Sequence, residues 1–214
     1  MMRAAAVRRV ARTAAATGQS PASLSVLRRN ARECKACPLW KAATQTVFGE
    51  GRASAGIVLV GEQPGDREDL AGKPFVGPAG RLLDRALEEL GIERRSVYVT
   101  NAVKHFKFEL RGKRRIHRKP VEREIAACHQ WLEGELAAIR PRLIVALGAT
   151  ATRAIFGRAT AIERNRGRIL KVADTKVSVL VTVHPSFLLR VPPEDTQREY
   201  RRFVADLALA KPYV

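Results

Sequence analysis

Residues 56–66 read GIVLVGEQPGD, a short apolar run that passes directly into a glycine-rich turn. The run at 57–60 is nearly continuous and β-branched, which is typical of a strand buried on both faces. In the turn, glycine and proline let the backbone approach a ligand closely. The turn lacks the Lys-Ser/Thr ending of a Walker A loop. This stretch therefore predicts an inner strand of a parallel sheet whose end contributes to a binding site.

Three further runs have the same character, at residues 96–100, 143–147 and 177–183. Helical patterns lie between and around them, at residues 21–31 (capped by Ser20), 81–90, 121–139, 149–156 and 194–210. Alternation of strands and helices is typical of a parallel sheet with helices on both faces. The sequence predicts an α/β fold, a three-layer α/β/α sandwich around a central four-stranded parallel sheet.

The length of 214 residues fits one domain, which we place at 21–214, preceded by a basic, flexible arm at 1–20. Residues 1–30 contain no acid and lack the apolar core of a secretory signal. An organellar transit peptide is the alternative for this Arg- and Ala-rich segment. No apolar run reaches the length of about 18 residues that a membrane helix needs. We expect a monomeric cytoplasmic protein without membrane contact.

Polar side chains follow each predicted strand. They include Glu62, Gln63 and Asp66 after the first, Asn101 after the second and His184 after the last. In open parallel sheets the ligand lies outside the carboxyl ends of the strands. Ordinary caps and turns are the alternative explanation, but their convergence on one edge favours a binding site.

A strongly basic segment at 104–119 contains eight Lys or Arg residues and one acid, Glu109. The whole chain has a net charge of +18, and such clustering favours a polyanionic partner, most simply nucleic acid, over a charge that only aids solubility. The segment includes the loop KRRIH at 113–117. A histidine at the tip of that loop, His117, adds a potential nucleophile or proton carrier, and we expect the loop to be flexible.

Several single residues suit recognition of a pyrimidine in DNA. The Asn101 amide offers a donor and an acceptor side by side, although an Asx turn is an alternative role. His184 could donate to an oxygen where negative charge develops. Phe75 could stack on a base or pack in the core, and Ser186 could bind phosphate.

The cysteines form a CxxC pair, Cys34 and Cys37, and a distant Cys128. An odd number of cysteines argues against a secreted disulfide scaffold. Zinc and four-iron clusters need four ligands, and His105 is the candidate fourth. Cys128 could instead be a small buried apolar residue on its helix.

Five segments, taken together and in order, resemble the uracil-DNA glycosylase superfamily: 34–39 (CKACPL), 61–66 (GEQPGD), 72–80 (GKPFVGPAG), 100–104 (TNAVK) and 184–190 (HPSFLLR). The resemblance is to the iron–sulfur branch, family four, and its covalent relatives, the UdgX proteins. Two departures from ordinary family-four members resemble UdgX: His105 replaces a cluster cysteine, and Gln63 stands where the best-studied members place a water-activating acid. The KRRIH loop is also similar to UdgX.

The resemblance implies a role for each matching residue. The ligands of a structural [4Fe-4S] cluster would be Cys34, Cys37, His105 and Cys128. The uracil-binding residues would be Gln63, Asp66, Phe75, Asn101 and His184. The DNA-binding residues would be Lys113, Arg114, Arg115, Ser186 and Arg190, with the 188–190 segment also entering the gap that the flipped base leaves. The catalytic residues would be Glu62, Gln63, His117 and His184.

Cleavage of the N-glycosidic bond leaves an oxocarbenium-like sugar and a uracil anion. We predict that neutral His117 then captures C1′ while Glu62 accepts or relays its proton, which links the protein covalently to abasic DNA. Nearby Lys and Arg would favour the neutral imidazole. The alternatives are a conventional glycosylase that leaves a free abasic site, a non-catalytic nucleic-acid-binding protein with a metal-stapled loop and, more distantly, a redox iron–sulfur carrier.

Overall fold

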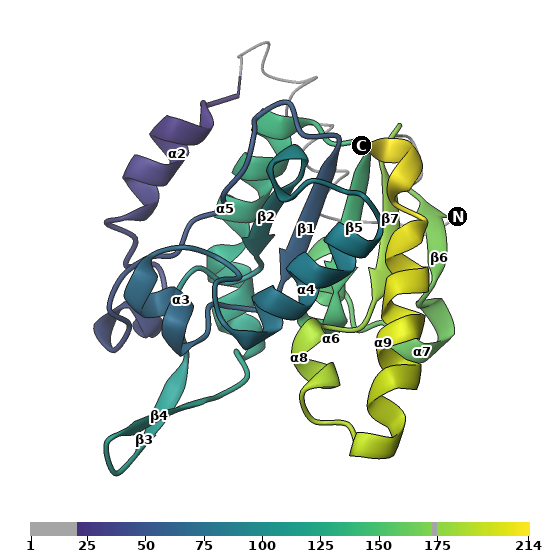
Figure 1. Cartoon of the computed structure of the whole chain (residues 1–214). Coiled ribbons are helices and arrows are strands. Elements are labelled where there is room, and N and C mark those ends of the chain that lie inside the picture. The colour runs from purple at the N-terminus through teal and green to yellow at the C-terminus, as the bar shows by residue number, and fades with distance from the viewer. Residues whose placement is uncertain (1–20, 173–174) are drawn as a thin grey trace.

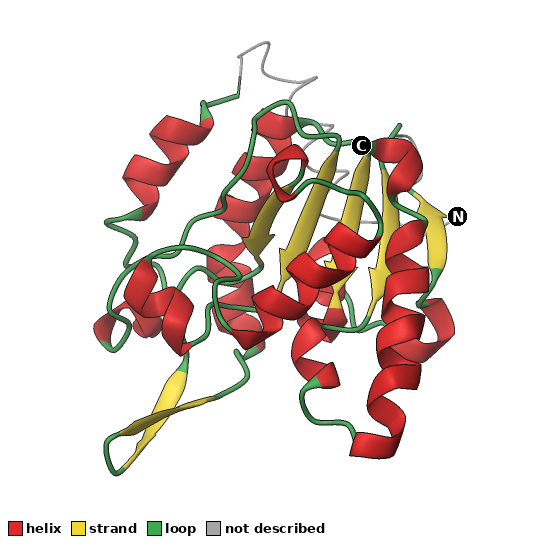
Figure 2. Ribbon diagram, viewed as in Figure 1, coloured by secondary structure: helices red, strands yellow, loops and turns green. Residues whose placement is uncertain are grey.

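The computed structural model describes residues 21–172 and 175–214, so the predicted N-terminal arm at 1–20 lies outside the described residues. Within them, the central sheet has five strands in the order β2-β1-β5-β7-β6 (Figures 1 and 2). Its strands are β1 (Ile57–Gly61), β2 (Tyr98–Asn101), β5 (Leu143–Leu147), β6 (Arg168–Lys171) and β7 (Ser178–Thr182). The first strand therefore lies at an inner position, as its apolar run predicts.

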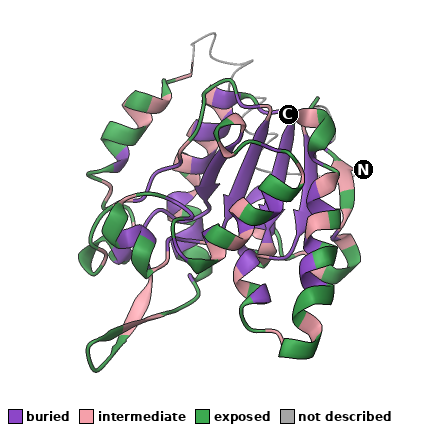
Figure 3. Ribbon diagram, in the orientation of Figure 1, coloured by how far each residue is buried: buried purple, intermediate pink, exposed green. Residues whose placement is uncertain are grey.

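Four of these strands are parallel and coincide with the four apolar runs. Val58 pairs with Tyr98, Ile57 with Leu143, and Leu143 in turn with Ser178. Every residue of β1, β2, β5 and β7 is buried (Figure 3). A strand with apolar neighbours on both faces needs no polar alternation, which is why the continuous runs identified it. The predicted four-stranded parallel sheet is confirmed.

Helices cover both faces of the sheet and complete the predicted three-layer sandwich (Figure 1). On one face, α5 (Glu122–Ile139) and α6 (Gly148–Phe156) pack against the side chains of Val58, Val60 and their neighbours. On the other, α4 (Pro78–Glu89) and α9 (Pro193–Ala208) pack against Ile57, Leu59 and their neighbours. Alternate residues of β1 thus enter two separate apolar layers.

The fifth strand, β6, was not predicted. It pairs antiparallel with β7, with Arg168 opposite Val181 and Lys171 opposite Ser178. Its sequence, RILK, is exposed at both ends and half-buried in the middle. An edge strand of this kind has no continuous apolar run, because only part of it packs against the core. The α/β class stands, with an antiparallel edge added to the parallel sheet.

The basic loop at 113–117 was expected to be flexible, but in the structure it is half of a β-hairpin. Strands β3 (Phe108–Arg111) and β4 (Arg114–His117) pair antiparallel, with Phe108 opposite His117. Gly112 has φ +57° in the turn between them, a conformation that glycine adopts at little cost. Figure 1 shows the hairpin projecting from the body of the domain. His117 therefore lies at the base of the hairpin rather than at its tip.

The remaining helices are short. They are α2 (Leu24–Ala31), α3 (Asp66–Ala71), α7 (Ile162–Asn165) and α8 (Pro185–Leu188), with 3₁₀ turns η1 (Pro38–Lys41), η2 (Arg94–Ser96) and η3 (Lys211–Tyr213). The cap of α2 is Ser23, whose side chain accepts from Val26 N, and not Ser20 as predicted. The described part of the chain contains no helix that is both long and apolar enough to cross a membrane.

Candidate active site

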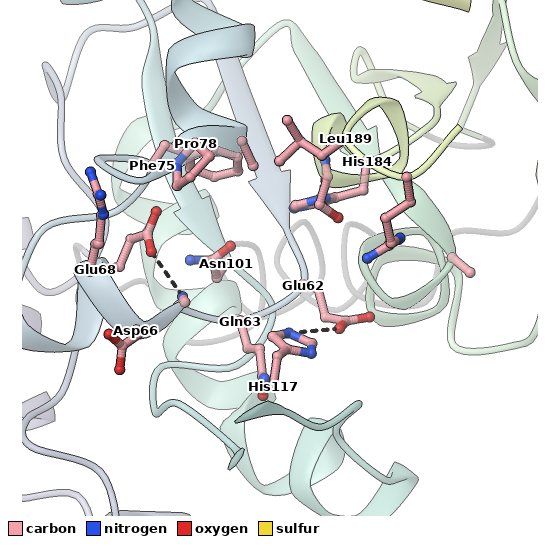
Figure 4. A pocket seen from close by; sticks show the side chains of 16 residues that line it. Glu62, Gln63, Asp66, Glu68, Phe75, Pro78, Asn101, His117, His184 and Leu189 are labelled. Carbon is pink, nitrogen blue, oxygen red and sulfur yellow. Dashed lines mark hydrogen bonds and ion pairs between the residues drawn. The ribbon is translucent and has the colours of Figure 1, made fainter. Parts of the chain in front are cut away.

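A cavity of about 670 Å³ opens at the carboxyl edge of the parallel sheet (Figure 4). It collects side chains from the ends of β1, β2, β4 and β7. The predicted residues that line it are Glu62, Gln63, Asp66, Phe75, Asn101, His117, His184, Ser186 and Arg190. Residues far apart in the sequence thus meet because parallel strands end at one edge.

The inner wall of the cavity is formed by Phe75 and Asn101, which are 6% and 3% exposed. The backbone at Gly61 lies against both: a Cβ there would overlap Asn101 Oδ1 and lie 2.6 Å from Phe75 Cζ. Phe75 has φ +59°, a costly conformation for a residue other than glycine and one that tends to occur at functional sites. An aromatic ring beside a buried amide suits a planar heterocycle with a hydrogen-bonding edge.

His184 is the N-cap of α8, and this position fixes its tautomer. Its Nδ1 accepts from Ser186 N at 3.2 Å and lies 2.8 Å from Ser186 Oγ. A nitrogen that accepts from a backbone N–H carries no proton, so the neutral ring bears its proton on Nε2. Burial, followed by the positive charges of His117 and Arg190, lowers the pKa of His184 to about 4. At neutral pH the ring is an uncharged donor facing the cavity.

Glu62 and His117 face each other across the mouth of the cavity, as Figure 4 shows. The His117 Nε2 lies 3.4 Å from Glu62 Oε1. The hydroxyl of Thr150, at the start of α6, donates to the other oxygen of the same carboxylate. Glu62 is thereby held with one oxygen engaged and one directed at the imidazole.

The imidazole of His117 is partly desolvated, with 49% of its side chain exposed. Burial is the main cause that lowers its pKa, Arg190 lowers it further and Glu62 opposes them. The residues at 113–115 were expected to supply this effect, but the cation that acts on His117 is Arg190 from the other side of the cavity. The neutral, nucleophilic form of His117 is therefore favoured at pH 7.

Gln63 anchors the base of the hairpin that carries His117. Its Nε2 donates to Lys107 O at 3.1 Å and to Arg118 O at 3.0 Å, while its Oε1 accepts from Lys107 N at 3.2 Å. Lys107 and Arg118 flank the hairpin and bond to each other. Both amide hydrogens of Gln63 are thus used on the main chain, so the predicted contact with uracil would require this anchor to open.

Arg115 joins β4 to α3. Its guanidinium lies 2.6 Å from carboxylate oxygens of both Asp66 and Asp69, and it stacks over the rings of Phe106 and Phe108. Only 18% of its side chain is exposed. Its charge is thus already balanced by two acids, and the predicted roles of Arg115 in DNA binding and Asp66 in uracil binding would have to compete with this pairing.

The exposed cations predicted to contact DNA lie at two places around the cavity. Lys113 and Arg114 are exposed at the tip of the hairpin, and Arg190 is exposed in the loop after α8. In the 188–190 segment, Leu188 is buried while Leu189 is 52% exposed and lines the cavity. Of the two leucines in this segment, Leu189 is therefore the one that is accessible to a ligand.

The three cysteines lie around α5 and are not among the residues that line the cavity. Cys34 Sγ accepts from Trp131 Nε1 at 3.2 Å, and Cys128 Sγ accepts from the backbone N–H of Lys104 at 3.1 Å. Burial raises the pKa of Cys128 to about 12, with smaller contributions in the same direction from Cys34 and Cys37. The thiols are therefore close enough for charge on one to oppose ionisation of another.

His105 adds a nitrogen donor with an unmet hydrogen-bonding capacity. Its Nε2 is 2.9 Å from Thr46 Oγ1, whereas its Nδ1 is buried without a partner. Over residues 21–172 and 175–214, no group of three or more His, Cys, Asp or Glu side chains is closed around a metal-sized site. The donor types nevertheless fit a thiolate-rich metal or cluster, because soft sulfur ligands suit iron and zinc.

Two contributors to the site were missed in the sequence. Thr150 holds Glu62 through its hydroxyl, and its only sequence signal is its place just after the third buried strand. Gly61 was assigned to the turn, but its contact with Asn101 and Phe75 depends on folding. Neither role could be inferred without knowing which strands are neighbours.

Comparison with known proteins agrees with this geometry. Residues 48–208 match the sequence model described as Uracil DNA glycosylase superfamily. The chain is 39% identical over 193 residues to a protein of Thermotoga maritima named Type-4 uracil-DNA glycosylase, covering 89% of this chain and 94% of that protein. A protein of the same name from Saccharolobus solfataricus is 37% identical over 178 residues, covering 80% and 79%. The chain belongs to the uracil-DNA glycosylase superfamily.

Proposed function

We propose that the chain excises uracil from DNA and then captures the resulting abasic sugar through His117, as a member of the UdgX-type covalent branch. One observation carries the second half of this proposal. The imidazole of His117 lies in the wall of the cavity that holds Phe75, Asn101 and His184, with its Nε2 3.4 Å from Glu62 Oε1. A nucleophile and a proton acceptor thus stand together beside the proposed base pocket.

In the first step the uracil nucleotide leaves the base stack and enters the cavity, at a cost that is lowest in single-stranded DNA. Phe75 stacks on the base and Asn101 pairs with its edge. The N-glycosidic bond breaks with its electron pair passing to N1 of uracil, which departs as an anion. The Nε2–H of neutral His184 stabilises the charge that develops on the uracil oxygen.

In the second step a ring nitrogen of His117 that carries no proton donates its lone pair to C1′ of the oxocarbenium-like sugar. The new N–C1′ bond places a positive charge on the imidazole. Its remaining ring proton passes to Glu62, which the Thr150 hydroxyl holds in place. The result is a neutral N-alkylated histidine, which is a poor leaving group, so the adduct persists.

Gln63 and the acids Asp66 and Glu68 in the cavity are already engaged by the protein, which favours capture over hydrolysis. Gln63 cannot act as a base, and its amide is bound to the main chain of Lys107 and Arg118. Asp66 is paired with Arg115, and Glu68 accepts from the backbone N–H groups of Gly65 and Gly77. Of the carboxylates that line the cavity in the described part of the chain, Glu62 is the one that faces the imidazole.

The conventional alternative is a glycosylase that releases uracil, leaves a free abasic site and turns over. The names of the relatives favour it, since they are called Type-4 uracil-DNA glycosylase. Incubation with a uracil-containing oligonucleotide, followed by boiling in SDS, separates the two. An adduct at one DNA per protein is expected for capture. Release of many uracils per protein, with no adduct, would support the conventional enzyme instead.

The yield of adduct should depend on pH through His117. A protonated imidazole has no lone pair to donate, so capture is lost as the pH falls through the pKa of His117. Burial and Arg190 lower that pKa below its ordinary value of about 6.5, so the midpoint is expected below pH 6.5. Quantifying the adduct on denaturing gels between pH 4 and 8 measures it. A midpoint above 6.5 would contradict the assignment of His117 as a neutral nucleophile.

We also propose that a [4Fe-4S] cluster is held by Cys34, Cys37, Cys128 and His105. The support is the mutual influence of the thiols on the pKa of Cys128 and the unpartnered Nδ1 of His105. When bound, the cluster would serve as a structural staple between the segment at 34–37 and α5. The reaction described above does not pass through it.

Protein purified under anaerobic conditions should accordingly be brown and contain iron and acid-labile sulfide. Cys128→Ser should lower the iron content and the thermal unfolding temperature, because Cys128 is a proposed ligand that lies on α5 and accepts from the backbone N–H of Lys104. Elemental analysis and a melting curve measure both effects. Zinc without iron would remove the cluster from the proposal and leave the uracil site unaffected.

A further inference from the structure

A fully buried ion pair lies directly beneath the strand that carries Asn101. Lys104 and Glu135 are both 0% exposed, and Lys104 Nζ is 2.6 Å from Glu135 Oε2. Glu135 also accepts from Tyr98 Oη at 2.9 Å, from Thr100 Oγ1 at 3.0 Å and from Gly49 N at 3.0 Å. Glu135 thereby joins α5 to the whole length of β2.

Lys104 follows β2 in the chain, and its side chain turns back toward the end of that strand. Its Nζ donates to the carbonyl oxygen of Asn101 at 2.8 Å and to Thr100 Oγ1 at 2.5 Å. The backbone between Asn101 and Lys104 is fixed to the end of β1, since Ala102 N donates to Gly61 O and Val103 N to Glu62 O. The main chain of Asn101 is therefore held from beneath by Lys104, while its side chain lines the cavity.

A gain in folding stability does not explain why this ion pair is buried. Removing two charges from water costs several kcal/mol per ion, and apolar residues of similar volume are often as stable. What an ammonium supplies, and an apolar side chain does not, is a set of directed hydrogen bonds. Here those bonds end on Thr100, on Glu135 and on the carbonyl of Asn101.

We propose that the Lys104–Glu135 pair is a positioning device that fixes Asn101 for reading the uracil edge. The inference rests on the proposed uracil excision and is independent of the capture by His117. Lys104 and Glu135 do not line the cavity and touch no substrate. Their effect passes through the main chain of Asn101, and through the wall that Asn101 forms with Phe75.

The decisive variant is the neutral pair Lys104→Met/Glu135→Gln. The glutamine carbonyl can still accept from Tyr98 and Gly49, and no charge is left buried, but the carbonyl of Asn101 loses its lysine donor. Single-turnover release of uracil at saturating protein should fall about 100-fold, as expected for misplacement of a recognition group by about 1 Å. In an Asn101→Ala background the same pair of changes should cause almost no further loss.

A matched control is available in the chain. Arg166 and Asp206 form a second buried ion pair, 3.0 Å apart, that joins the 166–167 turn to α9 and does not line the cavity. Arg166→Met/Asp206→Asn removes this pair, while Glu199, which also contacts Arg166 at 3.2 Å, keeps its ion pair with Arg202 at 2.8 Å. Rates for both pairs are compared at equal folded fraction, measured by thermal unfolding. The control variant should lose stability, but it should not show the loss of uracil release that depends on Asn101.

The outcomes separate this inference from the proposed function. If the unmodified protein releases no uracil, the proposed function fails. If it does, and the neutral pair releases uracil at the unmodified rate, only the positioning inference is overturned. The positioning inference is also overturned if the double variant fails to fold, or if its loss of uracil release is equally large in the Asn101→Ala background. In either case the ion pair serves the core alone.

Discussion

Replacing His117 with alanine is expected to abolish the SDS-resistant adduct while uracil release continues. The change removes the imidazole whose Nε2 lies 3.4 Å from Glu62 Oε1 at the mouth of the cavity. It leaves Phe75, Asn101 and His184 in the cavity, and we propose that these residues recognise the base and stabilise the leaving group. Water can then take the place of the ring beside C1′, so the variant should release more than one uracil per protein. Denaturing gels and quantification of free uracil measure the two effects.

A largely buried histidine of α5, which lies outside the cavity, provides the control for this experiment. His129 does not line the cavity, and His129→Ala should form the adduct as the unmodified protein does. An adduct that persists in His117→Ala would show that another group attacks C1′. Loss of uracil release together with the adduct would instead indicate that the change disturbs the hairpin and with it the pocket.

Replacing His184 with alanine should lower uracil release by about 100- to 1,000-fold, the usual effect of removing one preorganised donor to a developing oxyanion. The ring is held as a neutral Nε2–H donor by Ser186 N, and its pKa of about 4 keeps it uncharged over the physiological range. Adduct formation must fall by the same factor, because capture follows excision. Single-turnover rates of uracil release and of adduct formation, measured on the same samples, test this relation.

The two histidines are therefore expected to affect different steps. His184→Ala slows both excision and capture, whereas His117→Ala removes capture alone. If His184→Ala slowed capture but not uracil release, His184 would have to be reassigned from the leaving group to the sugar.

The central sheet could be predicted because its strands are buried on both faces. In β1 and β5, apolar side chains face a helix layer on either side, so the local composition is sufficient evidence. The edge strand β6 and the hairpin β3–β4 gave no such signal, since each is partly exposed and interrupted by charged side chains. Their pairing depends on contacts with partners that the local sequence does not specify.

The candidate site followed from the same logic. Parallel strands place their carboxyl ends at one edge, so Glu62, Asn101 and His184 could be expected to meet before any distance was known. The partners of Gln63 and Arg115 could not be predicted from the sequence. Gln63 bonds to residues 44 and 55 positions away, and Arg115 pairs with acids 49 and 46 positions away.

The apolar runs and the polar residues that follow them are thus enough to assign the α/β sandwich and the edge that holds the site. The individual roles of the residues in GEQPGD at 61–66 can be recognised only in the folded structure. Gly61 makes room for Asn101 and Phe75, Glu62 faces His117, and Gln63 fixes the base of the hairpin. These roles depend on distances of a few ångströms between segments remote in the chain, and such distances are set by packing rather than by local composition.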